Sequence, residues 1–173
     1  EEDRPFFKKA AMASREYLKM SCHPKTGMSA EYAYYNGKPF EKHREQFGGR
    51  HDWFYSDAYR TGANIGLDYE WFAQDDWSVE NNNKLQQFFM DTHKDEEFKI
   101  YEIDGRVIDQ PALHPVAIIA TLAQCSLSAD GPFAKECVEC FWNTPLRKGD
   151  RRYYDNCLYL FALIALSGNY RIW

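Results

Sequence analysis

The sequence lacks the features of several common functional classes. Its most apolar stretch, 158–166, is far too short to span a membrane. Basic residues form no run longer than the pairs Arg147-Lys148 and Arg151-Arg152, and the formal net charge is -5 at pH 7. The basic surface that a nucleic-acid backbone requires is therefore missing. We expect neither a nucleic acid nor a membrane as partner.

The cysteines offer neither an even disulfide set nor a full metal-ligand pattern. An odd number of thiols, three of them in apolar helical contexts, predicts reduced, buried cysteines in a reducing compartment, and hence a cytoplasmic location. Cys137 and Cys140 have the spacing of metal ligands, but no second Cys or His pair accompanies them, and the segment is predicted to be helical. No metal site is expected. The five are Cys22, Cys125, Cys137, Cys140 and Cys157.

The chain also lacks an initiator methionine. It begins with Glu1 and enters a predicted helix at once, which suggests the middle of a longer protein, so any signal peptide would lie upstream. At 173 residues it has the size of one ordinary domain.

Aromatic residues, in contrast, are abundant. They make up 17% of the chain, with 12 Tyr, 12 Phe and 5 Trp, which is more than a core of this size needs. The surplus suggests stacking surfaces, because sugar rings present apolar C–H faces that pack on aromatic side chains.

Hydrophobic periodicity predicts six helices and one small hairpin. A long connection at 24–52 includes a short strand-like piece at 31–35, and the hairpin at 98–108 turns at Asp104-Gly105. The helices at 114–127 and 154–166 are apolar on most faces, which predicts an inner layer buried on both sides. The other helices are predicted at 3–23, 56–72, 78–89 and 132–142.

The most informative segment is 53–60. Ser56 is predicted to cap the second helix, which places Asp57 in the first turn, where free N–H groups and the helix dipole stabilise an anion. Arg60 follows one turn later and adds a positive neighbour. Asp57 is therefore a candidate for accepting a proton from water. A capping acid with a surface ion pair is the more common role of such a pattern.

Several motifs together resemble the C-terminal part of glycoside hydrolase family 8. Within that family, they are most similar to the enzymes that release xylose from the reducing end of xylo-oligosaccharides. The resemblance covers essentially the whole chain but less than half of the family's catalytic domain. It implies that residues 1–173 form the C-terminal half of an (α/α)6 barrel, an all-α fold with one small hairpin, whose partner is the N-terminal half. The motifs are at 53–71, 114–115, 141–145, 152–155 and 167–173.

The resemblance implies hydrolysis of β-1,4 linkages with inversion, by a glutamic acid and a basic aspartate, without a cofactor. Asp57 matches the general base, and Arg60 would orient it. The Glu-Gly-Met-Ser-type motif that carries the acid is absent. Glu31 and Glu70 do not lie in matching contexts, so the isolated chain should lack half of its catalytic pair and be inactive.

Substrate contacts are implied in the same way. Leu113-His114-Pro115 matches a kinked loop that blocks the cleft beyond the leaving xylose, where His114 would bind sugar hydroxyls; otherwise it simply opens a helix. The segment with Arg152, Tyr153, Tyr154 and Asp155 matches an aromatic part of the cleft, although tyrosines before a buried helix are mostly core residues.

Trp53 and Tyr55 are the remaining candidates for substrate binding, because they precede Asp57 in the aromatic segment. Two other functions stay open. An endo-acting xylanase of the same family would need an open cleft beyond His114. A non-catalytic, sugar-binding half-barrel would need no general acid.

Overall fold

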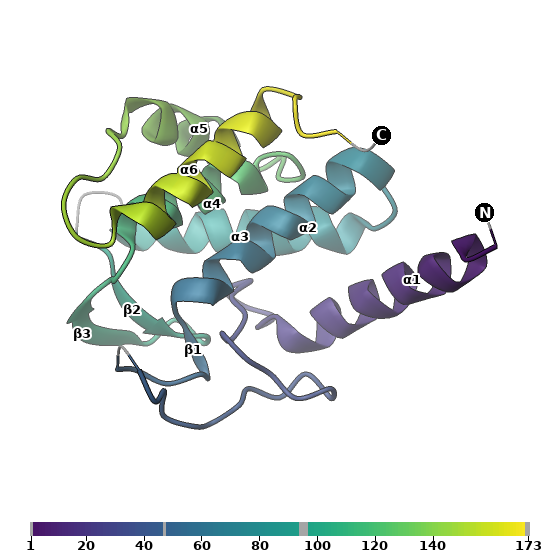
Figure 1. Cartoon of the computed structure of the whole chain (residues 1–173), viewed down its shortest axis with the longest axis horizontal. Helices are drawn as coiled ribbons and strands as arrows, with labels where there is room; N and C mark the ends of the chain where they lie inside the picture. The colour runs from purple at the N-terminus through teal and green to yellow at the C-terminus, as the bar shows by residue number, and fades with distance from the viewer. Residues whose placement is uncertain (1, 47, 94–96, 172–173) are drawn as a thin grey trace.

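The computed structural model describes residues 2–46, 48–93 and 97–171. The described part is mostly helical, with a small antiparallel sheet at one end (Figure 1). The helices are α1 (Arg4–Ser21), α2 (Tyr59–Phe72), α3 (Asp76–His93), α4 (Pro115–Cys125), α5 (Ala134–Asn143) and α6 (Arg152–Leu166), and a 3-10 turn, η1 (Ser56–Ala58), precedes α2. The strands are β1 (Trp53–Phe54), β2 (Lys99–Glu102) and β3 (Val107–Pro111).

Helix α4 lies at the centre of the helical part. It contacts α2, α3, α5 and α6. Eight of its eleven residues are buried, as expected for a helix that is apolar on most faces. The predicted inner position of this helix is therefore confirmed within the described chain.

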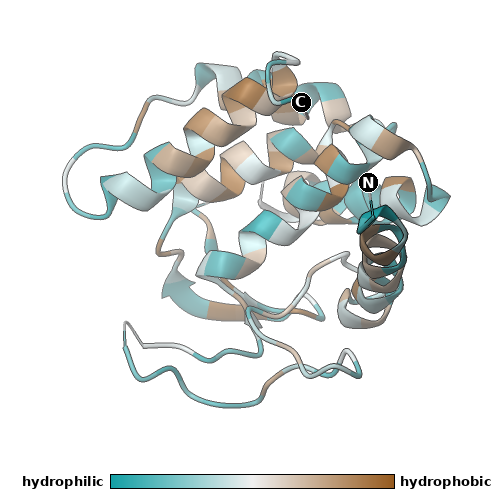
Figure 2. Cartoon of the chain, turned by 45° about the vertical axis from the view of Figure 1, so that its right-hand side comes forward, coloured by the Kyte–Doolittle hydropathy of each residue, from teal (hydrophilic) through white to brown (hydrophobic). Residues whose placement is uncertain are grey.

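Helix α6, unlike α4, is buried on only one of its faces. Leu158, Ala162 and Ala165 face the core, whereas Leu160 and Phe161 are 50% and 48% exposed. The hydropathy colouring shows apolar residues on the outer surface of this helix as well (Figure 2). An apolar pattern shows that a face needs covering but does not show which segment covers it.

The predicted hairpin is confirmed and extended. Strands β2 and β3 are joined through Gly105, whose φ of +96° suits the tight turn. Strand β1 pairs with the other edge of β2 and makes a third strand, which sequence reasoning missed. Since β1 leads directly into η1, the sheet fixes the position at which α2 begins.

Two local predictions are wrong. Segment 31–35 is not a strand and has only an isolated bridge between Ala33 and Pro39. The third helix begins at Asp76 rather than Ser78, because the Asp75 carboxylate accepts a hydrogen bond from the Trp77 N–H at 3.0 Å.

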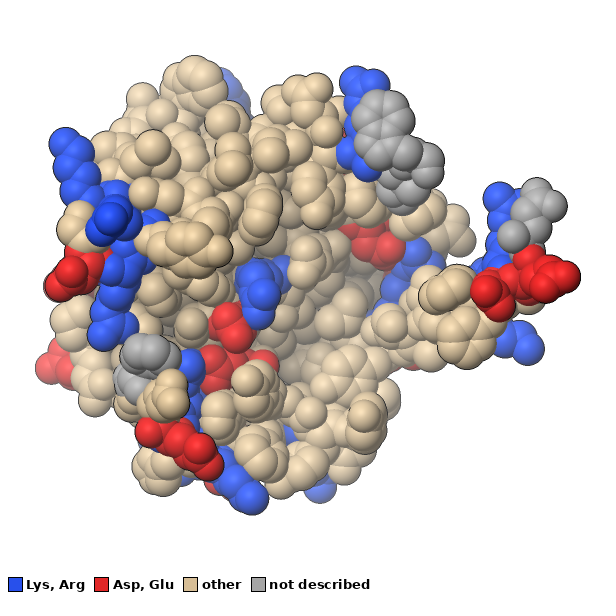
Figure 3. All heavy atoms as spheres, in the orientation of Figure 1, with Lys and Arg blue, Asp and Glu red and all other residues tan. Residues whose placement is uncertain are grey.

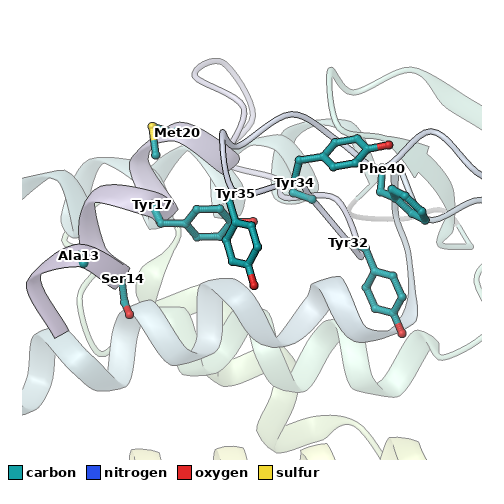
Figure 4. A pocket seen from close by; sticks show the side chains of 9 residues that line it. Ala13, Ser14, Tyr17, Met20, Tyr32, Tyr34, Tyr35 and Phe40 are labelled. Carbon is teal, nitrogen blue, oxygen red and sulfur yellow. The ribbon is translucent and has the colours of Figure 1, made fainter. Parts of the chain in front are cut away.

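Helix α1 projects beside the body of the molecule (Figure 1). Arg15 makes two 2.7 Å hydrogen bonds to Asp68 of α2, and Lys19 forms a 2.6 Å ion pair with Asp75. A groove of about 860 Å³ runs between α1 and the loop that follows it, and Tyr17 and Tyr35 lie close together there (Figure 4). Much of the apolar surface of α1 is exposed, including Phe6, Phe7, Met12 and Met20.

All five thiols are free. Cys22, Cys125 and Cys137 are buried, as predicted, whereas Cys140 is exposed and Cys157 is partly exposed. No group of three or more His, Cys, Asp or Glu side chains in the described ranges could hold a metal ion. None of the described helices is both long enough and apolar enough to cross a membrane.

Candidate active site

Asp57 lies where the chain passes from β1 into the helical layer. Ser56 turns the chain with a φ of +42°, an uncommon conformation for a residue other than glycine. The N-cap of the 3-10 turn is Tyr55 and that of α2 is Ala58, so the predicted N-cap role of Ser56 is wrong. Asp57 still lies in the first turn, here the 3-10 turn before α2, where backbone N–H groups point toward an anion.

One oxygen of the Asp57 carboxylate is held by two donors. Oδ1 lies 3.2 Å from Nη2 of Arg60 and 3.2 Å from the hydroxyl of Tyr154. Oδ2 has no hydrogen-bond partner among the residues that the structure describes, and the Asp57 side chain is 39% exposed. The expected pairing of Asp57 with Arg60 is thus present, and the arrangement leaves one oxygen free to accept a proton.

Tyr154 connects Asp57 to the body of α6. Its hydroxyl also lies 3.0 Å from the carbonyl oxygen of Ser56. Burial of the phenol raises the pKa of Tyr154, and the negative charge of Asp57 raises it further. The hydroxyl therefore stays protonated and donates its hydrogen.

His114 lies on the other side of Tyr154, with the two ring centroids 4.5 Å apart. It directly precedes Pro115, the first residue of α4, and is 7% exposed. Nδ1 of His114 lies 2.8 Å from Oδ2 of Asp155, a residue of α6 that is fully buried. This contact joins two segments of the predicted site, 113–115 and 152–155.

Asp155 is buried with three donors around its carboxylate. Burial raises its pKa, but hydrogen bonds from His114, from Arg147 and from the N–H of Ala117 lower it, and the net pKa is below the ordinary value. Arg147 Nη1 lies 2.6 Å from Oδ2, and the Ala117 nitrogen lies 2.9 Å from Oδ1. Asp155 is therefore an ionised carboxylate, and each of these groups must donate to it.

The remaining predicted residues do not join this cluster directly. Arg152 and Tyr153 are exposed at the start of α6, where Arg152 donates to the Gly149 carbonyl at 3.0 Å. Trp53 is partly exposed in β1. Tyr55 is only 2% exposed, and the guanidinium of Arg44 lies over its ring at 4.8 Å, so Tyr55 supports the adjoining loop.

The two acidic residues that were considered as catalytic acids have other environments. The Glu31 side chain is 1% exposed and pairs with Arg44 and, at 2.7 Å, with His51. It holds the long loop together. Glu70 is exposed near the end of α2, more than three turns along the chain from Asp57.

Sequence reasoning missed the roles of Arg147 and Asp155. Asp155 stands 41 residues from His114 in the chain, and an acid in the first turn of a helix ordinarily suggests a favourable dipole interaction. The available signal was a charged residue among the apolar residues of α6. That signal predicts a partner but does not identify it.

Comparison with known proteins finds close relatives. The chain is 58% identical over 174 residues to the reducing end xylose-releasing exo-oligoxylanase of Halalkalibacterium halodurans, an alignment that covers 100% of this chain and 43% of that protein. It is 54% identical to the reducing-end xylose-releasing exo-oligoxylanase Rex8A of Paenibacillus barcinonensis, over 100% of this chain and 44% of that protein. No family model matches the chain.

Solved structures show the same fold. The structure of Rex8A from Paenibacillus barcinonensis complexed with xylose matches 99% of this chain and 44% of that chain, with a TM-score of 0.91 and 53% identity. A crystal structure of a reducing end xylose-releasing exo-oligoxylanase matches with a TM-score of 0.89 and 57% identity, again over 99% and 44%. This chain therefore spans less than half the length of these relatives.

Proposed function

We propose that the chain is the C-terminal portion of a glycoside hydrolase family 8 catalytic domain that releases xylose from the reducing end of β-1,4-xylo-oligosaccharides. Residues 1–173 would form half of an (α/α)6 barrel. The support is that relatives named for this activity align with the whole chain at 58% and 54% identity. The helical arrangement around α4 is compatible with one half of such a ring.

The observation that carries the proposal is the state of the Asp57 carboxylate. Arg60 and Tyr154 both hold Oδ1, whereas Oδ2 is free among the described residues. A general base needs a fixed orientation and one accessible lone pair. In the proposed reaction Oδ2 accepts a proton from water while the water oxygen bonds to the anomeric carbon, and the leaving xylose oxygen takes a proton from the acid.

The general acid would come from the preceding half of the domain. Neither Glu31 nor Glu70 suits the role, because Glu31 is enclosed in ion pairs and Glu70 is too distant. In an inverting enzyme the two carboxyl groups are typically ~6.5–9.5 Å apart, which leaves room for the water. The preceding half would also cover the apolar surfaces of α1 and α6, in keeping with the rarity of large apolar patches on soluble proteins.

His114 is assigned to the leaving xylose. This assignment is supported by the packing of its ring against Tyr154, whose hydroxyl contacts the proposed base. Arg152 and Tyr153 are assigned to substrate because they are exposed, and Trp53 because it is partly exposed, whereas the buried Tyr55 packs under Arg44 of the adjoining loop. Hydrolysis by two carboxylates requires no cofactor.

The test is product analysis by NMR, using the complete protein and xylotriose. The proposal expects xylose and a newly formed α-anomeric reducing end, with longer oligosaccharides losing one xylose at a time. A β-anomeric product would contradict inversion, and internal cuts would indicate an endo-acting enzyme. Substrate binding without turnover would indicate a sugar-binding protein.

A further inference from the structure

We propose that Asp155 and Arg147 are positioning residues, which fix the imidazole of His114 so that Nδ1–H points at Asp155 and only Nε2 is available to a sugar hydroxyl. This inference rests on the proposed function, in which His114 faces the leaving xylose. It adds two residues that do not themselves touch the substrate. Their effect would be exerted entirely through the orientation and hydrogen placement of one histidine.

The hydrogen placement follows from the surroundings of the Asp155 carboxylate. Oδ2 receives His114 Nδ1 at 2.8 Å and Arg147 Nη1 at 2.6 Å, while Oδ1 receives the Ala117 N–H at 2.9 Å. An ionised carboxylate can only accept hydrogen bonds, so Nδ1 must carry a hydrogen. A partner on one ring nitrogen of histidine determines which nitrogen remains for other contacts.

The orientation of the ring follows from a second set of contacts. The same Nη1 of Arg147 donates to the carbonyl oxygen of Leu113 at 2.7 Å, so one guanidinium group holds both the carboxylate and the residue before His114. Asn156 fixes Arg147 in turn. Its Oδ1 accepts from the Arg147 N–H at 2.9 Å, and its Nδ2 donates to the Arg147 carbonyl at 3.1 Å.

His114 is thus held at its ring by Asp155, and the backbone just before it is held by the bond from Arg147 to the Leu113 carbonyl. Nε2 has no hydrogen-bond partner among the described residues, while the ring packs against Tyr154. A purely stabilising role would not require this arrangement, because buried ion pairs contribute little more than well-packed apolar groups of the same volume. The arrangement instead suits a histidine whose single free nitrogen must point in one direction.

The first test measures directly whether Nδ1 of His114 carries a hydrogen. In the complete enzyme with 15N-labelled histidine, the His114 resonances are assigned by their loss in His114→Gln. We expect a protonated, hydrogen-bonded Nδ1 in the unaltered enzyme and loss of this single state in Asp155→Asn. An unprotonated Nδ1 in the unaltered enzyme would overturn the proposal. This measurement requires no catalysis, so it stands even if the proposed activity is wrong.

The second test asks whether Asp155 acts through His114. Asp155→Asn should lower kcat/KM on xylotriose by roughly tenfold, the value of one lost oriented hydrogen bond. The loss should disappear when the same change is made in His114→Gln. An equal loss in both backgrounds would show a merely structural role and overturn the proposal.

Two further variants complete the design. Asp109→Asn, at an exposed carboxylate of β3, makes the same chemical change and should leave kcat/KM unaltered. If Asp155→Asn does not fold, Arg147→Lys replaces it in the kinetic cycle, because lysine keeps the charge but its shorter side chain moves the donor away from the Asp155 carboxylate and the Leu113 carbonyl. The NMR result on the unaltered enzyme decides the hydrogen placement in either case.

Discussion

The hydroxyl of Tyr154 lies 3.2 Å from Oδ1 of Asp57, although 97 residues separate the two in the chain. This contact joins the start of α6 to the turn before α2. It makes the orientation of the candidate base depend on the packing of α6, and not only on Arg60 within its own helix.

Replacing Tyr154 by Phe should therefore lower kcat in the complete enzyme by roughly 10- to 100-fold, the value of one or two oriented hydrogen bonds. Steady-state rates on xylotriose measure this loss. The matched control is Tyr170→Phe, since the ring of Tyr170 stacks on Trp71 and its hydroxyl has no hydrogen-bond partner among the described residues.

Removing the base itself should have a larger effect. Asp57→Asn should reduce kcat by about 10²–10⁴-fold, the usual contribution of a general base. The fold should change little, because the ion pair with Arg60 is partly exposed and such pairs contribute at most about 1 kcal/mol. Turnover and thermal unfolding of the same samples separate the two effects. A near-normal rate would remove Asp57 from the mechanism.

The local part of the site could be predicted from sequence, and the long-range part could not. Asp57 and Arg60 are three residues apart, and helical spacing alone brings them together. No such spacing relates Tyr154 to Asp57 or His114 to Asp155, because those contacts depend on how α6 packs against the turn before α2 and against the start of α4.

In the fold too, the features with local sequence signals could be predicted, and those that depend on long-range pairing could not. The long apolar helices and the Asp104-Gly105 turn have strong local signals, and the structure contains them. Strand β1 has only two residues, too few for an alternating pattern to be visible. The turn at Ser56 is imposed by the pairing of β1 with β2, which overrides the capping preference of serine.

Close packing of α2 against α4 leads to a stability prediction. A Cβ at Gly66 would lie 2.7 Å from the carbonyl oxygen of Gln124 and 3.3 Å from Cα of Cys125, so the two helices would have to move apart. Gly66→Ala should therefore destabilise the protein by about 1–3 kcal/mol, despite the better helix propensity of alanine.

Denaturant unfolding of the complete protein measures this change. Asn64→Ala, at an exposed position of the same helix, is the control and should be neutral or slightly stabilising. If Gly66→Ala were stabilising by about 1 kcal/mol, propensity would have prevailed and the close approach of the helices would not be required.

The buried carboxylate of Asp155 predicts a pH dependence. Because its folded pKa lies below the ordinary value of 3.8, its ionised form stabilises the folded state above pH 3.8, and this contribution is lost as pH falls through the folded value. Breaking the buried pair with Arg147 should cost about 3–5 kcal/mol near neutral pH.

The difference in unfolding free energy between the unaltered protein and Asp155→Asn should accordingly shrink in acid. Thermal unfolding at a series of pH values from neutral to below 3.8 measures this difference. A difference that stayed constant throughout would mean that the Asp155 carboxylate does not titrate as the structure requires.

The thiols should differ sharply in reactivity, since the thiolate is the nucleophilic form and must also be accessible. Burial raises the pKa of Cys22 and of Cys137 to about 12, and that of Cys125 well above its usual range. At mildly alkaline pH these three remain neutral and enclosed, whereas Cys140 on the outer face of α5 is exposed. A maleimide should therefore label Cys140 first and the buried three only on unfolding.

Mass spectrometry of peptides from briefly labelled protein identifies the modified residue. Cys140→Ser should remove the rapid phase, leaving the slower reaction of the partly exposed Cys157. Rapid labelling of Cys125 would contradict the central packing of α4, because Cys125 is fully buried in one hydrophobic cluster with Leu85 of α3 and Cys137 of α5. The order of labelling thus tests the central position of α4 without reference to any catalytic assignment.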